Sequence, residues 1–270
     1  MEEKFIDIKK VIGEKNPKLL KKLPTFVINY LNKVIHQDEV NDFMLANKDS
    51  DGFQFSENVL KFFNIEVEAI GIENVPTTGG VILACNHPIG GMDAMALIQA
   101  IKPHRRDIKF VVNDILLALK NLAGLFVGVN KHGKNSIQSL NEMNEVYSSG
   151  GATFVFPAGL VSRKMNGKVE DLEWKKTFVT RAKKFDLPII PVFVDGSLSN
   201  FFYRLSSLRQ MAGIKANLEM LYLADEQFRQ RDKKINIYFG QRIESADLSG
   251  EKSDLKWAQE IKQKVYQLKK

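Results

Sequence analysis

The chain has 270 residues and a hydrophobic fraction of 44%, values of an ordinary globular protein that buries a sizeable core. Its single cysteine, Cys85, excludes an internal disulfide, and no apolar run approaches the ~18 residues needed to span a bilayer. The net charge of +7 suits an anionic partner, but the absence of zinc-finger spacing, RNP-type aromatics and an arginine-rich arm argues against nucleic acid.

Residues 1–60 are predicted to be helical, and their start, MEEKFIDIKK, lacks the basic-then-apolar order of a signal peptide. Pro24 is expected to separate a short first helix from a longer second one. The apolar face of this helical pair either covers the core of the next domain or lies in a membrane interface, with lysines reaching the headgroups. The apolar face and its neighbouring lysines are Leu19, Leu20, Leu23, Phe26, Val27, Tyr30, Leu31, Val34 and Ile35, with Lys18, Lys21, Lys22 and Lys33.

From residue 65 onward, short strand-like runs alternate with helical ones. The predicted strands are 65–70, 81–85, 109–112, 125–129, 153–156, 189–194 and 234–239. The predicted helices are 93–101, 114–121, 135–148, 174–185 and 253–268. This alternation predicts an α/β domain over residues 61–270, with a mixed, largely parallel central sheet flanked by helices. In such sheets, functional sites gather where strands end and loops begin.

Asn86 and His87 follow an apolar strand, and Asp93 opens the next helix, in the stretch ILACNHPIGGMD. A neutral imidazole, with an ordinary pKa near ~6.5, acts as a general base at physiological pH. It works best where a carboxylate fixes its tautomer, and Gly90 and Gly91 would let the loop fold back so that Asp93 reaches the ring. Taken alone, the motif is more typical of a structural histidine and a helix-capping aspartate.

Three further segments favour a functional site over a purely structural role. The first, GATFVFPAGLVSRK, places four polar or conformationally special residues after a strand: Pro157, Gly159, Ser162 and Arg163. A loop with small residues, exposed amides and an arginine suits a phosphate or carboxylate. The second, GLFVGVNKHGKNS, places Asn130 and Lys131 before a helix start, where cations again suit an anion. The third, LPIIPVFVDG, is a buried strand marked by two prolines, and each segment alone also fits ordinary structure.

In order and spacing, the four segments resemble the phosphate/glycerol acyltransferase family, which includes the lysophospholipid acyltransferases. That family carries an Asn-His-(four residues)-Asp block, a Gly-rich block ending in arginine, a Phe-Pro-Glu-Gly-Thr-Arg block and a Val-Pro-Val block. The resemblance covers about residues 65–240. It implies acyl transfer from an acyl-carrier-protein or coenzyme A thioester to a lysolipid hydroxyl, with His87 as base and Asp93 as its partner. This mechanism needs no metal or bound cofactor, and the sequence shows no metal-ligand spacing.

The chain departs from the family pattern at two places. Five residues, Pro88–Met92, separate His87 from Asp93 instead of four, a spelling that resembles a bacterial branch often described as haemolysin-like. That branch is similar to enzymes that O-acylate N-acyl amino acids to give ornithine or glycine lipids. The second departure is Ala158, which stands where the glycerol-phosphate enzymes carry glutamate. The predicted acceptor is therefore an N-acyl amino acid, and lysophosphatidic acid is the alternative.

Arg163 and Lys131 are the predicted ligands of the acceptor's anionic group. The other predicted substrate-binding residues are Asn86, Asn130, Pro157, Gly159 and Ser162. Cys85 precedes His87 by two residues, but nothing nearby lowers its pKa and strand alternation turns it to the other face from Asn86. A structural role is therefore expected for Cys85 rather than a covalent acyl-cysteine.

We expect an enzyme that binds peripherally to the cytoplasmic face of the inner membrane, with an anionic membrane surface as a partner. Two rival interpretations stay open at this stage. In the first, the protein uses its basic helices to bind membranes and catalyses no reaction. In the second, the same histidine and aspartate hydrolyse a thioester, with water as the acceptor.

Overall fold

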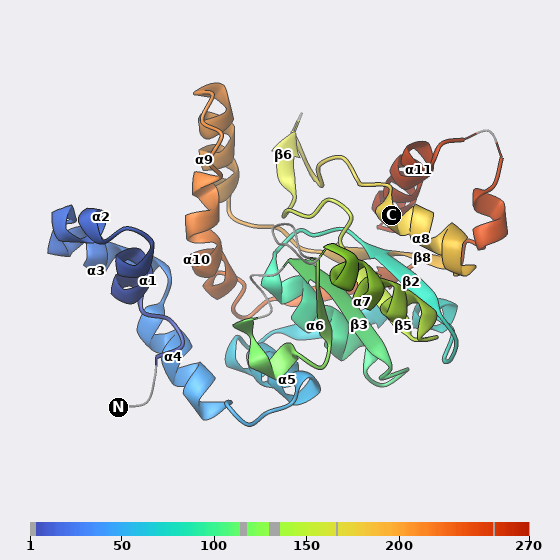
Figure 1. Ribbon diagram of the computed structural model, residues 1–270, viewed down its shortest axis with the longest axis horizontal. Coiled ribbons are helices and arrows are strands. Elements are labelled where there is room, and N and C mark those ends of the chain that lie inside the picture. Colours follow the sequence, from blue (N-terminus) through green and yellow to red (C-terminus); the bar gives the residue numbers. More distant parts are fainter. Residues whose placement is uncertain (1–3, 114–117, 130–135, 166, 251, 270) are drawn as a thin grey trace. The chain divides into compact units, whose positions relative to one another are not determined.

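The computed structural model describes residues 4–113, 118–129, 136–165, 167–250 and 252–269 (Figure 1). The chain divides into two compact units, a first of Met1–Ser50 and Leu198–Arg231 and a second of Asp51–Ser197 and Asp232–Lys270. The first unit therefore combines the N-terminal fifty residues with residues 198–231, an excursion from the chain of the sheet domain. The predicted helical segment, residues 1–60, did not include this excursion.

The sheet of the second unit has strand order β1-β9-β8-β2-β5-β3-β4. Its neighbours pair parallel except β8 and β9, which run antiparallel. The strands are Glu66–Ile70 (β1), Val81–Cys85 (β2), Ile108–Asn113 (β3), Phe126–Val129 (β4), Ala152–Val155 (β5), Ile189–Asp195 (β8) and Lys234–Phe239 (β9). The predicted mixed, largely parallel sheet is confirmed. Each of the seven predicted strands is present, with ends that agree to within about one residue.

The second unit also contains the helices Gly52–Phe62 (α5), Gly91–Ile101 (α6), Ser136–Ser148 (α7), Thr177–Phe185 (α8) and Asp254–Gln267 (α11), and the 3-10 helices Ile72–Asn74 (η1), Lys120–Leu122 (η3) and Ser245–Leu248 (η5). Ser253 caps α11 as predicted, because its side chain accepts the N–H of Lys256. The predicted helix 114–121 begins outside the described residues. A two-stranded antiparallel hairpin, Arg163–Met165 (β6) and Lys168–Glu170 (β7), was not predicted.

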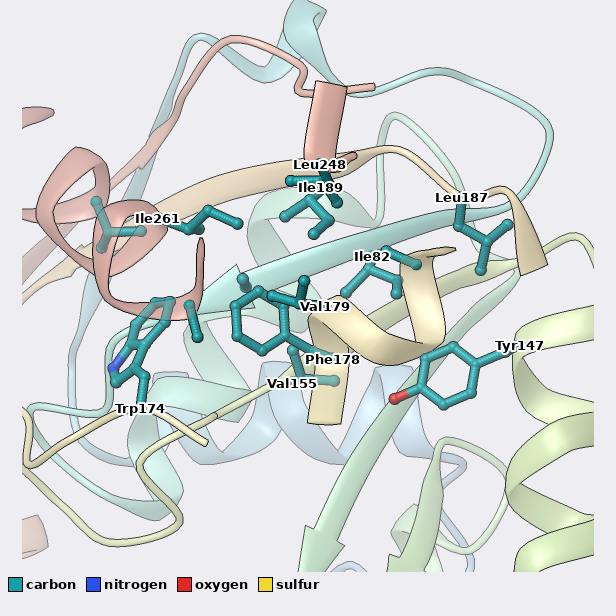
Figure 2. Packing of buried hydrophobic residues seen from close by; sticks show 14 of the residues in the cluster. Ile82, Tyr147, Val155, Trp174, Phe178, Val179, Leu187, Ile189, Leu248 and Ile261 are labelled. Carbon is teal, nitrogen blue, oxygen red and sulfur yellow. The ribbon is translucent and has the colours of Figure 1, made fainter. Parts of the chain in front are cut away.

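One part of the core of the second unit lies between the sheet and the helices α8 and α11 (Figure 2), and α6 contributes other fully buried residues such as Leu97 and Ile98. Phe178 and Val179 of α8 pack against the strand residues Ile82 and Ile189, and Trp174 is fully buried on the side of α11. Every residue of β2 and β5 is buried, as expected for central parallel strands covered on both faces. Each large apolar side chain buried in this way stabilises the fold by about 1.5–3 kcal/mol.

The first unit is helical within its described residues: Ile8–Lys15 (α1), Pro17–Lys22 (α2), Thr25–Val34 (α3), Gln37–Ala46 (α4), Asn200–Met211 (α9), Leu218–Tyr222 (η4) and Leu223–Phe228 (α10). Pro24 precedes α3, as predicted. The N-terminal fifty residues nevertheless form more than a helical pair. Asn16 ends α1 and caps α2 by accepting the N–H of Leu19, so α1 is an additional helix that precedes the predicted pair. No helix of the described residues is long and apolar enough to cross a membrane.

Candidate active site

The strand order places the predicted motifs at one edge of the sheet. Strand β2 lies between β5 and β8, and all three run parallel, so their carboxyl ends meet there. Asn86 directly follows β2 and is almost fully buried. Its side-chain amide donates to Val194 O at 3.0 Å and its Oδ1 accepts Val194 N–H at 2.7 Å. These two bonds to β8 fix the start of the loop that carries His87, and the predicted contact of Asn86 with substrate stays a prediction.

The next residue, His87, forms the predicted pair with Asp93. His87 Nδ1 lies 2.8 Å from Asp93 Oδ2, and Asp93 Oδ2 also accepts the backbone N–H groups of Ile89 at 3.1 Å and Gly90 at 3.0 Å. Gly90 has φ +76°, a conformation that residues with a Cβ rarely adopt, and it is the N-cap residue of α6. This single turn lets the loop fold back despite its additional residue.

The environment of the pair suits a general base. Asp93 is fully buried, and this burial raises the pKa of its carboxyl, against the opposing effect of the hydrogen bonds from His87 and Ile89. A carboxylate that accepts from Nδ1–H leaves the lone pair of the neutral imidazole on Nε2. The His87 side chain keeps 19% of its surface exposed, and its ring packs on Phe156 with centroids 4.3 Å apart. Nε2 is therefore the atom of the pair that can take a proton from an incoming hydroxyl.

A second buried carboxylate, Asp171, holds the same loop and was missed by the sequence analysis. Asp171 Oδ1 accepts His87 N–H at 3.1 Å and the Ser162 hydroxyl at 2.6 Å, while Oδ2 accepts the Trp174 indole N–H at 2.8 Å. Ser162 N–H in turn donates to His87 O at 2.8 Å. The backbone of His87 is thus hydrogen-bonded on both sides, by Asp171 and by Ser162.

The C-terminal helix α11 holds the peptide groups of Asp171. Asp171 N–H donates to Tyr266 Oη at 2.7 Å, and Lys262 Nζ donates to Asp171 O at 2.6 Å. Burial, together with the nearby Asp171 charge, raises the pKa of Tyr266 far above its ordinary value, so the phenol stays neutral. The sequence signal was weak, because Asp171 stands in the charged run VEDLEWKK and two of its partners, His87 and Tyr266, lie far away in the chain.

The loop after β5 brings further predicted residues next to this network. Pro157 is buried, and its carbonyl accepts Lys175 N–H at 3.1 Å. Gly159 has φ +68°, and its N–H donates to Phe156 O at 3.0 Å, which closes the turn beneath the His87 ring. Ala158 is 7% exposed and belongs to the apolar cluster around Trp174. The packing of this loop holds the Phe156 ring against the His87 ring.

Arg163 is placed differently from what an exposed anion ligand requires. It is 2% exposed, and its Nη1 donates to Val161 O at 2.5 Å and to Ser162 O at 3.3 Å. Its guanidinium therefore also stiffens the segment that contacts His87, and its predicted anion-binding role stays a prediction. The other two predicted ligands in this group, Asn130 and Lys131, lie outside the described residues.

Cys85 is fully buried, and its Sγ donates to Leu83 O at 3.6 Å. Burial raises the pKa of this thiol, with a smaller effect from the charges of Asp93 and Asp171. A protonated, inaccessible thiol is a poor nucleophile. Among the described residues, no group of three or more His, Cys, Asp or Glu side chains is placed to hold a metal ion. The geometry at this edge allows proton transfer by His87 Nε2, with Asp93 bonded to Nδ1.

Known proteins are similar to this chain over nearly its whole length. Two curated relatives, each called a lyso-glycine lipid O-acyltransferase, are 40% identical in Bacteroides thetaiotaomicron and 38% identical in Phocaeicola vulgatus. Each alignment covers 98% of this chain, with 97% of the first relative and 95% of the second.

A solved structure, the 1-acyl-sn-glycerophosphate acyltransferase PlsC from Thermotoga maritima, has a similar fold, with a TM-score of 0.50 and 19% identity. That likeness covers 97% of this chain and 98% of the solved one. A family model described as acyltransferase matches residues 10–270. The chain, in which His87 is hydrogen-bonded to the buried Asp93, is therefore an enzyme that belongs to the acyltransferase family.

Proposed function

We propose that the protein transfers a fatty acyl group from an acyl-carrier-protein or coenzyme A thioester to the hydroxyl of a lyso-glycine lipid. The observation that carries the proposal is the 2.8 Å bond between His87 Nδ1 and the buried Asp93, which leaves Nε2 available as a base. The names of the two full-length relatives support this acceptor, since both are called lyso-glycine lipid O-acyltransferases.

The reaction follows from the geometry of the pair. His87 Nε2 takes the proton of the acceptor hydroxyl as its oxygen attacks the thioester carbonyl carbon. Asp93 stabilises the positive charge that develops on the imidazole, and Asp171 and Ser162 keep the backbone of His87 in place. When the tetrahedral intermediate collapses, the carbon–sulfur bond breaks and the thiolate takes the proton back from His87. The products are an ester and a free thiol.

Ala158 supports an acceptor with a single negative charge. Its side chain lies in an apolar cluster, so the loop after Phe156 carries no carboxylate there to organise cations around a phosphate. The carboxylate of an N-acyl glycine needs fewer organised cations than a phosphate monoester. We therefore propose glycine lipid as the preferred acceptor, with the ornithine analogue next and lysophosphatidic acid last.

The test is to measure kcat/KM for lyso-glycine lipid, lyso-ornithine lipid and lysophosphatidic acid with one acyl-carrier-protein donor. A preference for the glycine lipid over lysophosphatidic acid of about 10-fold or more is expected, the scale of one charge-assisted hydrogen bond. A clear preference for lysophosphatidic acid would contradict the assigned acceptor. Free fatty acid without acylated lipid would indicate a hydrolase. If neither the acyl-carrier-protein thioester nor the coenzyme A thioester gives any product, a membrane-binding protein without catalytic activity would be favoured.

We place the enzyme peripherally on the cytoplasmic face of a membrane. Its acceptor is a lipid, and α2 and α3 combine exposed apolar residues with Lys18, Lys21, Lys22 and Lys33. Such a helical surface suits the interface of a bilayer with anionic lipids.

A further inference from the structure

Exposed apolar side chains are concentrated in the first unit. Of the fifteen large hydrophobic residues that are exposed in the described part of the chain, twelve belong to residues 1–50 and 198–231. These two ranges make up less than a third of the 270 residues. Six of the twelve belong to the excursion that leaves the sheet after β8: Phe201, Leu208, Met211, Ile214, Leu218 and Leu221. An even distribution would not produce this concentration, so a binding surface is a better explanation than chance exposure.

The excursion is a helical hairpin, formed by α9, a turn at residues 212–217, and η4, and we call residues 207–218 its tip (Figure 1). Arg209 of the tip pairs through Nε with Glu219 Oε2 at 2.8 Å, and Glu219 is fully buried. Arg209 Nη1 also donates to Ile214 O at 2.7 Å across the turn. These bonds give the tip a defined conformation. Its apolar side chains are exposed even though the hairpin has a buried interior.

The exposed fractions at the tip are high for apolar residues. Met211 is 84% exposed and Leu208 is 62% exposed, and Ile214 and Leu218 each exceed a third. Within the unit, buried residues of the same helix, Phe202 and Ser206, already face the interior, so the exposed side of α9 is a separate face. Removing this apolar face from water therefore requires a binding partner or an apolar medium.

The charges around the tip favour an anionic lipid surface. Residues 196–224 contain one acidic residue, Glu219, which is buried against Arg209, whereas Arg204 and Lys215 are exposed. A symmetric contact between two copies would bring these cations towards their own counterparts, which disfavours a dimer at this face. Anionic headgroups would meet Arg204 and Lys215 while the apolar side chains enter the acyl boundary.

The hairpin also contacts the other helical surface of the first unit at its base. Tyr222 at the end of η4 shares a hydrogen bond with Tyr30 of α3, with 3.0 Å between the two hydroxyls, and its ring meets Phe201 at 4.9 Å. Residues 15–37, which include α2 and α3, contain no aspartate or glutamate. Two segments without exposed acids, distant in the sequence, are therefore joined in one unit.

We propose that the tip of this hairpin inserts into the interface of an anionic bilayer as a second membrane anchor. It adds to the contact assigned above to α2 and α3, and it does not depend on the identity of the acyl acceptor. Leu208, Met211, Ile214 and Leu218 supply the apolar contact, and Arg204 and Lys215 supply the attraction to headgroups.

The direct test is a fluorescent label at the tip of the full-length protein. Cys85 is buried and its thiol has a raised pKa, so a M211C variant should be labelled at position 211 alone. Wild type treated with the same dye should stay unlabelled, which checks this. With phosphatidylglycerol-containing vesicles, an environment-sensitive dye at 211 should shift to the blue. The same dye in a L255C variant, on the exposed side of α11 in the second unit, should not shift. A vesicle-bound protein whose label at 211 stays in an aqueous environment overturns the proposal.

A second measurement uses Leu208→Ser with Met211→Ser, and Leu255→Ser as the control. The double variant should partition into these vesicles at least ~10-fold more weakly, as expected when two apolar side chains lose their insertion, while Leu255→Ser stays like wild type. Turnover of a water-soluble short-chain acceptor should be unchanged in both, which separates this result from a failure of the proposed reaction. Unchanged vesicle binding, or a concentration-dependent dimer that the double substitution abolishes, overturns the proposal in favour of another role for the face.

Discussion

At the residue scale, the proposed chemistry depends on His87 and on two buried carboxylates that hold it, Asp93 and Asp171. His87 and Asp93 are six positions apart and meet because Gly90 takes a positive φ between them. Asp171 adds a further constraint, since it hydrogen-bonds the backbone of His87 rather than its ring. One carboxylate orients the base and the other positions the loop, so removing either should affect turnover through different physical effects.

Replacing the base itself should nearly abolish transfer. We expect His87→Ala to lower kcat/KM by at least ~10²-fold, the usual effect of losing a general base, while the fold is retained. Asp93→Asn should cause a comparable loss, because a neutral amide does not stabilise the imidazolium. Acyl-transfer assays and circular dichroism of both variants check this. A folded His87→Ala enzyme with near wild-type turnover would show that His87 is not the base.

Asp93→Asn should also make the fold more stable at neutral pH. Burial raises the pKa of Asp93 in the folded state, so the folded protein binds the proton more tightly than the unfolded chain. Stability from this group is present below the unfolded pKa and is lost as the pH rises through the folded value. A neutral asparagine avoids that loss. Chemical denaturation from pH 4 to pH 8 should show the variant's advantage growing with pH, and a constant or shrinking difference would contradict the burial argument.

Asp171 should behave as a positioning residue. Asp171→Ala leaves the His87 N–H, the Ser162 hydroxyl and the Trp174 indole N–H without their buried acceptor, which should destabilise the fold by about 3 kcal/mol or more. Asp171→Asn keeps one carbonyl oxygen and should recover most of the stability. Urea unfolding and the pH profile of kcat for both variants provide the measurement. Equal stability of Asp171→Ala and wild type would show that these bonds contribute little.

At the element scale, short helices in the first unit carry the proposed membrane contact, whereas α11 supports, through Asp171, the loop that follows His87. Helix α11 reaches Asp171 through Lys262 and Tyr266, although the sequence motifs of the site end long before this helix begins. Helices α2 and α3 belong to the first unit. They offer exposed apolar residues and lysines, which is the composition of an interfacial element.

The four lysines of α2 and α3 should contribute to vesicle binding. Each lysine near an anionic surface adds about 1 kcal/mol, so replacing Lys18, Lys21, Lys22 and Lys33 by glutamine should weaken binding strongly, and added salt should weaken wild-type binding. The matched control replaces exposed lysines of the second unit: Lys168, Lys184, Lys256 and Lys264. Cosedimentation with vesicles at several salt concentrations is the measurement. Equal effects of the two sets would assign the attraction to overall charge rather than to α2 and α3.

At the scale of the whole molecule, the second unit carries the proposed catalytic pair, and the first unit carries most of the exposed large apolar side chains among the described residues. The central strands β2, β5 and β8 are buried almost throughout and form the rigid support that the dyad requires. The first unit has several short helices with few buried residues, and α2 has none. Regions with few buried apolar contacts open more easily than a central sheet.

Hydrogen exchange should reflect this difference. Backbone amides of β2, β5 and β8 should exchange slowest, at rates that approach global unfolding, and those of α1 to α3 should exchange much faster. Anionic vesicles should slow exchange in α2, α3 and the α9 hairpin while leaving the central strands unchanged. Mass-spectrometric exchange with and without vesicles measures both effects. Protection of the first unit equal to that of the central strands in the absence of lipid would contradict this description.

The sequence by itself determined the elements whose cause is local. Apolar runs long enough for buried strands predicted the seven strands, and parallel order followed from their alternation with helices. It also determined the His87–Asp93 pair, because both residues flank one strand end and a glycine turn connects them. Only the tertiary structure showed the role of Asp171, the buried position of Arg163, and the hairpin that joins the N-terminal helices. Asp171 reaches His87 and Tyr266, and Tyr222 reaches Tyr30, across 84 to 192 residues of chain, and neither periodicity nor spacing carries information about such contacts. Whether a charged side chain such as Arg163 is buried is likewise decided by the packing around it.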